Sequence, residues 1–191
     1  MYHVNKDPRS IKSANMLYDG LAKLIQSKPL HLITVTDLIN ASNVGRTTFY
    51  RQFDQVEDIL WLRSDQVFED MIQYLIAYIQ EYGNEPRVML LKPVLRYFNA
   101  HSEIIELLIK VNRLDIAMAS LHRAVEPYRT RALTYLGVDE AYVGYNITIR
   151  VGIVTNILVQ WIGTGKQEPP DELADRLSTM IKYMVTLDQL L

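Results

Sequence analysis

The segment from residue 33 to residue 60 constrains the fold of this chain more than any other. Thr34 and Asp37 have the spacing of a capping box, which predicts the start of a short helix. Asn43 can adopt the left-handed backbone conformation that a sharp turn needs, and Gly45 then stands at the start of a second short helix. The segment therefore predicts a helix-turn-helix unit followed by a longer third helix.

The second short helix has two different sides. Phe49 and Phe53 are four residues apart, so they lie on one face and can pack onto the preceding helices, with Val44 filling the corner. The remaining positions carry side chains that suit base edges in a DNA major groove: Arg46, Thr47, Thr48, Arg51 and Gln52. Taken alone, these residues are also compatible with a helix that is merely exposed to solvent.

The first quarter of the chain is basic and the remainder is acidic. Residues 1–53 contain seven lysines and arginines against three acidic residues, a net charge of +4, whereas residues 54–191 have a net charge of −6. This asymmetry favours an anionic partner at the N-terminal end, although an excess of this size also arises by chance.

Almost the whole chain has the periodicity of α-helices. Apolar residues recur at helical spacing over residues 10–27, where Ser10 is the expected N-cap, and residues 55–82 form a long helix. Further helices are predicted at 87–100, 102–110, 113–126, 127–136, 139–163 and 170–191, with Pro93 and Pro127 kinking or dividing them. No segment alternates convincingly with the period of a strand, so we predict an all-α fold of about nine helices.

Several kinds of chemistry are not expected. The chain has no cysteine, which excludes disulfides and thiolate sites, and its four histidines have no metal-ligand spacing. We therefore expect no enzyme activity, no cofactor and no metal. The apolar stretch from residue 142 to residue 162 is interrupted by polar side chains such as Arg150, so we expect a buried helix and no membrane span.

The segment described first resembles the N-terminal pattern of the TetR-type transcriptional regulators. The matching residues keep one fixed register: Thr34, Val35, Leu38, Ile39, Ser42, Asn43, Val44, Gly45, Thr48, Phe49, Tyr50, Phe53, Glu57, Asp58, Ile59 and Leu60. Three positions depart from it. Asn43 replaces the usual turn glycine, Gly45 replaces the usual serine N-cap, and Val56 replaces a lysine that often contacts a phosphate.

The resemblance implies a helix-turn-helix DNA-binding domain at residues 1–54 and a helical ligand-binding and dimerisation domain at residues 55–191. It also implies a homodimeric, cytoplasmic repressor that binds a double-stranded DNA operator and is released by a small-molecule effector. Tyr50 and Thr36 would hold DNA phosphates.

The last predicted helix carries the most regular apolar pattern of the chain. Its apolar residues alternate at spacings of four and three, which is typical of a helix-packing seam: Leu173, Leu177, Met180, Ile181, Met184 and Leu187. In the preceding helix, Gly144 and Gly152 would let another helix approach closely, and Trp161 belongs to a weaker similarity to the last helices of one TetR subgroup. The resemblance implies that both helices form a dimer interface; a seam within one chain is the alternative.

Candidate effector contacts are polar and aromatic residues of the C-terminal part. They comprise Tyr74, Tyr78, Tyr97, His101, Arg113, Asn146 and Arg150. For the tyrosines, simple packing is the more common role, and for Arg150 the more common explanation is an intramolecular salt bridge. Two functions are compatible with the whole pattern. The first is a ligand-responsive repressor, and the second is a co-regulator of the same fold that acts through protein contacts, which the loss of the lysine at Val56 favours.

Overall fold

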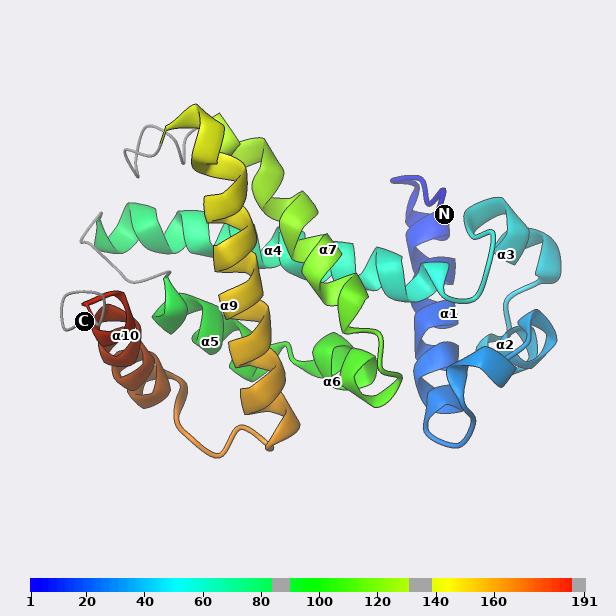
Figure 1. The fold of residues 1–191 in the computed structure, drawn as a ribbon. Coiled ribbons are helices and arrows are strands. Elements are labelled where there is room, and N and C mark those ends of the chain that lie inside the picture. The colour runs from blue at the N-terminus through cyan, green and yellow to red at the C-terminus, as the bar shows by residue number, and fades with distance from the viewer. Residues whose placement is uncertain (84–89, 131–138, 187–191) are drawn as a thin grey trace.

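The computed structural model describes residues 1–83, 90–130 and 139–186, with the backbone alone for 184–186. Nine α-helices lie in these ranges, and the only strand-like pairing there is an isolated bridge between Tyr2 and Phe53 (Figure 1). The all-α fold and its number of helices are therefore confirmed. The predicted helices at 87–100, 127–136 and 170–191 extend in part outside the described residues.

Three helices form an N-terminal unit, which we call the head: α1 (Pro8–Ile25), α2 (Val35–Ser42) and α3 (Arg46–Gln52), with the short turn η1 (Leu30–Leu32) between the first two. The predicted N-cap of α1 is wrong. Asp7 caps the helix by accepting a hydrogen bond from the backbone N–H of Arg9, and Pro8 occupies the first turn, where its missing N–H costs nothing. Ser10 is buried inside the helix instead.

The turn between α2 and α3 forms as the sequence predicts. Thr34 and Asp37 make both hydrogen bonds of the capping box, and Asn43 has the left-handed dihedral angles φ 56° and ψ 30°. Gly45 is the N-cap of α3 and makes no side-chain cap. In α1, a Cβ at Gly20 would meet the backbone of Ser42 at 3.1 Å, so this glycine lets α1 and α2 approach closely.

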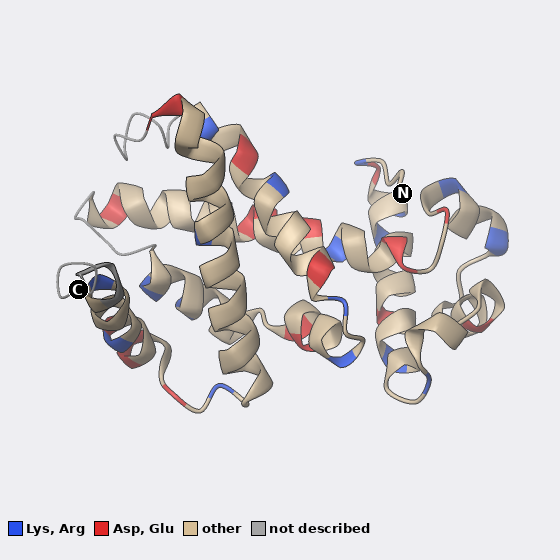
Figure 2. Ribbon diagram, viewed as in Figure 1, with Lys and Arg blue, Asp and Glu red and all other residues tan. Residues whose placement is uncertain are grey.

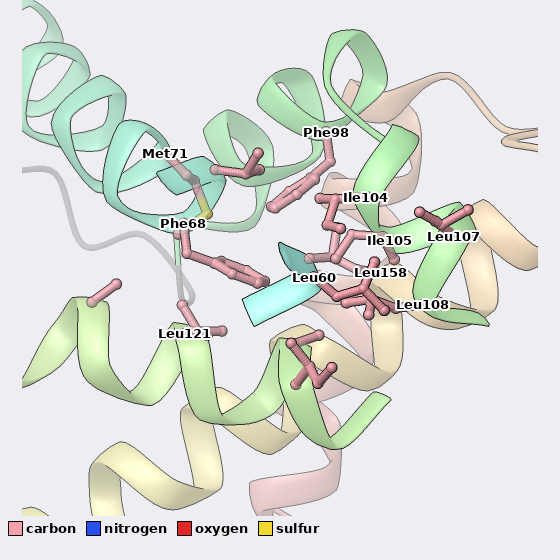
Figure 3. Close-up of a cluster of buried hydrophobic side chains, with 14 of the residues drawn as sticks. Leu60, Phe68, Met71, Phe98, Ile104, Ile105, Leu107, Leu108, Leu121 and Leu158 are labelled. Atoms are coloured by element: carbon pink, nitrogen blue, oxygen red, sulfur yellow. The ribbon is translucent and has the colours of Figure 1, made fainter. Parts of the chain in front are cut away.

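The remaining helices form a unit that we call the body. The long helix α4 (Asp58–Tyr82) starts beside the head and runs into the body, where α6 (Glu103–Lys110) and α7 (Leu114–Val125) pack against it and α9 (Val143–Gly163) packs against α6 and α7 (Figure 1). Figure 3 shows the buried side chains that these helices and α5 (Leu91–Ala100) contribute, with the rings of Phe68 and Phe98 5.5 Å apart. This apolar cluster is the main stabilising element of the body.

Helix α10 (Pro170–Thr186) lies against α5. Two ion pairs join them, Lys92 to Asp175 at 3.0 Å and Arg96 to Asp171 at 2.6 Å. Pro93 does not kink a helix, because it lies in the first turn of α5, where no hydrogen bond of its N–H is lost. Pro127 lies in the 3-10 turn η2 (Glu126–Tyr128), which directly follows α7.

The segment Glu140–Gly163, which comprises the turn η3 (Glu140–Tyr142) and α9, is long and apolar enough to cross a membrane, and about a third of its most apolar 18-residue stretch is buried. One such helix is weak evidence for a membrane span, since core helices of soluble proteins share these properties. One side of α9 packs on α6 and α7, whereas Tyr145 and Ile149 on another side are exposed, so the expected buried helix is only partly buried within this chain.

Candidate nucleic-acid interface

The inner side of α3 is fixed by aromatic packing. Phe49 and Phe53 are fully buried, with ring centroids 5.9 Å apart, and Val44 is buried beside them. A seven-residue helix is too short to be stable alone, so its orientation depends on this contact with α1 and α2. The packing leaves the opposite side of α3 directed away from the head.

The outer side of α3 presents polar and basic groups. Arg46, Thr47, Tyr50 and Arg51 are exposed, and Thr48 is half-buried. The Arg46 guanidinium donates a hydrogen bond of 2.7 Å from Nη2 to Oγ1 of Thr36, so these two predicted DNA contacts from α3 and α2 lie together. Figure 2 shows the basic residues of α3 at the outer edge of the head, away from the acidic residues of the body.

Gln52 does not belong to this outer side, so its predicted contact with a base is wrong. Its side chain is only 1% exposed, and Nε2 donates to the backbone oxygen of Ser10 at 3.1 Å and to the hydroxyls of Ser10 and Ser13 at 2.8 Å each. The reason is helical geometry: Gln52 follows the buried Phe49 by three residues and therefore faces α1. The amide holds α3 against α1.

The loop between α3 and α4 is acidic. The N-terminal ammonium group of Met1 donates to the carboxylates of Asp54 at 3.0 Å and of Asp58 at 2.7 Å. This ammonium group, followed by His3, lowers the pKa of the Asp54 carboxyl. Val56 packs against the core and offers no charge. The loop therefore lacks the cation that a phosphate contact at this position would need.

Comparison with known proteins identifies the family. A TetR-type family model, described as a transcriptional regulator C-terminal region, matches residues 88–183, which is just over half of the chain. The chain belongs to the TetR family of transcriptional regulators. No curated protein matches the sequence significantly.

Solved structures share the fold of this TetR-family chain. Lin0861 from Listeria innocua has a TM-score of 0.75 at 14% identity, covering 95% of this chain and 96% of its own. The fatty acid degradation regulator FadR from Bacillus halodurans has a TM-score of 0.52 at 15% identity, covering 92% and 95%. The match of the family model supports a DNA-binding transcriptional regulator, and such regulators are generally not enzymes.

Part of the predicted effector site of this TetR-family chain lies together on α4 and α5. The rings of Tyr74 and Tyr97 are 5.7 Å apart, and the ring of His101 lies 4.7 Å from Tyr97. Burial raises the pKa of Tyr97 to about 12, and its hydroxyl donates to the backbone oxygen of Val67 at 3.2 Å. Tyr78 stacks on Tyr82, with centroids 4.7 Å apart.

Arg113 does not join these tyrosines. It pairs with Glu57 at 2.6 Å and with Asp115 at 2.8 Å, at the corner between α6 and α7. Tyr74 is 16 residues beyond the start of α4, which corresponds to about 24 Å along the helix axis. The prediction that Arg113 and Tyr74 share one pocket is therefore wrong. Arg113 instead lines a surface cleft of about 520 Å³ between the head and the body.

Arg150 and Asn146 form a polar pair on α9. The Arg150 Nε donates to Oδ1 of Asn146 at 2.7 Å, and no carboxylate of the described residues pairs with this guanidinium. Arg150 is half-buried, and burial lowers the pKa of its guanidinium. A partly desolvated cation without an acidic partner is a favourable place for an anionic group.

The predicted dimer residues divide into two groups. Gly144 and Gly152 lie on open parts of α9, where an added Cβ would meet no atom within 4 Å, and Met180 is exposed on α10. Leu173, Leu177 and Ile181 are half-buried and pack against their own chain. Trp161 is a core residue: it is only 2% exposed, and its indole N–H donates to the backbone oxygen of Glu168 at 3.0 Å. The side chain of Met184 and all of Leu187 lie outside the described residues.

Proposed function

We propose that the chain is a homodimeric repressor whose α3 reads a DNA operator. The observation that carries the proposal is the outer side of α3, where Arg46, Tyr50 and Arg51 are exposed while Phe49 fixes the helix from behind. Arginine pairs with guanine in the major groove, and the Tyr50 and Thr36 hydroxyls suit phosphates. Residues 1–54 would be the DNA-binding domain and residues 55–191 the regulatory domain of this cytoplasmic protein.

A homodimer is supported by the uncovered side of α9. Tyr145 and Ile149 are 71% and 60% exposed there, one turn apart, and Gly152 continues the same side without a side chain. An apolar stripe of this kind costs free energy when it faces water, and a second copy packed against it would remove that cost. Two heads are also needed, because one helix-turn-helix unit contacts few base pairs.

Release by a small effector is supported by aromatic and charged groups of the body. The neighbouring rings of Tyr74, Tyr97 and His101 and the half-buried Arg150 offer aromatic and charged contacts of the kind that ligand sites use. An effector that binds one conformation of the body more tightly than another would respace the two heads and lower the affinity for the operator.

The proposal is tested by footprinting at low salt on the DNA upstream of the gene that encodes the chain, together with sedimentation to measure the oligomeric state. We expect a dimer that protects two half-sites separated by about 34–36 Å or a multiple of that distance. A dimer that shows no footprint on this DNA would contradict the proposed repressor.

The alternative is a co-regulator that acts through protein contacts, and the α3–α4 loop favours it. Asp54 and Asp58 place two carboxylates beside the position where Val56 replaces a phosphate-binding lysine. Val56→Lys should tighten binding to an operator fragment and add about one unit to the slope of log affinity against log salt. Val56→Leu is the uncharged control. An unchanged slope in Val56→Lys would place this position away from the DNA backbone.

A further inference from the structure

The N-terminal arm, residues 1–7, is attached to the end of the recognition helix. The backbone N–H of His3 donates to the oxygen of Gln52 at 2.7 Å, and the backbone N–H of Asp54 donates to the oxygen of Met1 at 3.3 Å. These bonds pair Tyr2 with Phe53 as an isolated β-bridge. A movement of Tyr2 therefore also moves Phe53, the residue that directly follows α3.

The Tyr2 side chain leaves the head and reaches α4. Its hydroxyl donates to Oδ2 of Asp65 at 2.6 Å. The other oxygen of this carboxylate, Oδ1, accepts a hydrogen bond of 2.5 Å from Nη2 of Arg123 on α7. The guanidinium of Arg123 also lies over the ring of Trp61, 4.9 Å from its centroid. One carboxylate thus joins the arm of the head to a helix of the body.

Asp65 depends on both partners. It is only 8% exposed, and a carboxylate removed from water is unfavourable unless charged or hydrogen-bonding groups compensate it. Burial and the hydrogen bond to Asp65 raise the pKa of Tyr2, so the phenol keeps its proton and remains a donor at neutral pH. The three residues therefore behave as one unit: if Arg123 moves away, Asp65 is left undercompensated and the bond to Tyr2 changes with it.

We propose that Tyr2, Asp65 and Arg123 form a clasp between head and body that sets the angle of the recognition helix relative to α7. The three are positioning residues for DNA reading, since none of them belongs to the outer side of α3. Through the clasp, a displacement of α7 moves the arm and with it the head. This coupling acts in addition to the direct contact of the head with the start of α4. Its effect on DNA rests on the proposed operator binding, whereas its effect on the arm does not.

The clasp is tested first without DNA, by amide hydrogen exchange in the full chain. Tyr2→Phe removes only the hydroxyl, and Arg123→Gln removes the guanidinium, with its charge and its hydrogen bond to Asp65, from α7. We expect either change to speed exchange of the His3 and Asp54 N–H groups by about tenfold, because their hydrogen bonds hold the arm. The matched controls are Tyr128→Phe, whose hydroxyl accepts from Gln73, and Arg129→Gln, whose guanidinium pairs with Glu126.

The second measurement is operator affinity. We expect Tyr2→Phe and Arg123→Gln each to weaken binding by about three- to tenfold, measured at a temperature at which both variants remain folded. In the double variant, the fold-loss of operator affinity should be smaller than the product of the two separate fold-losses, because both changes act through the same carboxylate. The two control variants should bind as the unchanged protein does.

The outcomes separate the two proposals. Unchanged exchange at His3 and Asp54, or multiplicative effects of the two substitutions, would overturn the clasp while leaving operator binding intact. Faster exchange with unchanged affinity would also overturn it, because the arm would then not position α3. If the unchanged protein binds no DNA but exchange still responds to Arg123→Gln, the repressor proposal fails and the link between α7 and the arm stands.

Discussion

The head and the body differ in how far apart in the sequence the residues lie whose contacts stabilise each unit. In the head, the capping box joins Thr34 and Asp37, three residues apart, and Asn43 gives the turn its left-handed backbone conformation. In the body, the ion pair between Arg113 and Glu57 joins residues 56 positions apart. Local contacts can be recognised in a sequence, whereas distant ones depend on the finished packing. This difference explains why the helix-turn-helix unit is recognisable in the sequence and a site for the proposed effector is not.

The largest expected effect tests whether head and body unfold together. Phe49→Ala and Phe98→Ala each remove a fully buried ring, one from the head and one from the body, and should lower the free energy of unfolding by about 3–5 kcal/mol. Urea titration of both variants measures this. A single transition shifted equally by either change would show that the two units are one cooperative structure, whereas a separate early transition in Phe49→Ala would show that the head unfolds alone.

The next prediction concerns the outer side of the head. Arg46→Ala or Arg51→Ala should weaken specific operator binding by about 1–3 kcal/mol, the usual effect of losing a good base contact. Arg176→Ala on α10 is the charge-matched control, since its guanidinium pairs with Glu172 on the surface of the body. Fluorescence anisotropy of a labelled operator gives the affinities. If neither substitution in α3 weakens binding, the assignment of α3 as the reading helix is wrong.

Gln52 sharpens the contrast between the two sides of α3. Gln52→Ala removes the donor that Ser10 and Ser13 share and should lower the free energy of unfolding by about 1–3 kcal/mol. It should leave the preference among operator sequences unchanged, because the amide is buried and contacts no base. If the free-energy difference between operator sequences changes by more than the free energy of unfolding does, Gln52 contacts a base after all.

The smallest expected effect is a pH dependence in the head. The Lys28 ammonium, followed by the backbone and hydroxyl of Thr34, lowers the pKa of Asp37. A lowered folded pKa means that the ionised carboxylate stabilises the fold above the usual aspartate pKa, and that this contribution is lost as the pH falls through the folded value. Asp37→Asn should therefore be less stable than the unchanged protein at neutral pH and approach it in acid. A constant difference across this range would contradict the role of the charge.

The features that the sequence predicted correctly depend mostly on residues close together in the sequence. Contacts between residues far apart in the sequence were harder to predict. The helices, the capping box and the aromatic back of α3 follow from spacing, so they were predictable residue by residue. Gln52 was misplaced although its offset of three from Phe49 carried the signal. Arg113 was misplaced for another reason, since its partner Glu57 is 56 positions away and is set by tertiary packing. Trp161 was misplaced because tertiary packing buries its side chain in the core of its own chain.

The two tryptophans of the chain stand at informative places. Trp61 lies beneath the Arg123 guanidinium where arm, α4 and α7 meet, whereas Trp161 lies at the end of α9, bonded to the backbone that leads to α10. Replacing one of them by phenylalanine leaves a single tryptophan, either beside the clasp or beside the proposed subunit contact. The fluorescence of each single-tryptophan variant can therefore report on one event without an attached dye. Trp61 would report on movement at the clasp, and Trp161 on the proposed pairing of subunits.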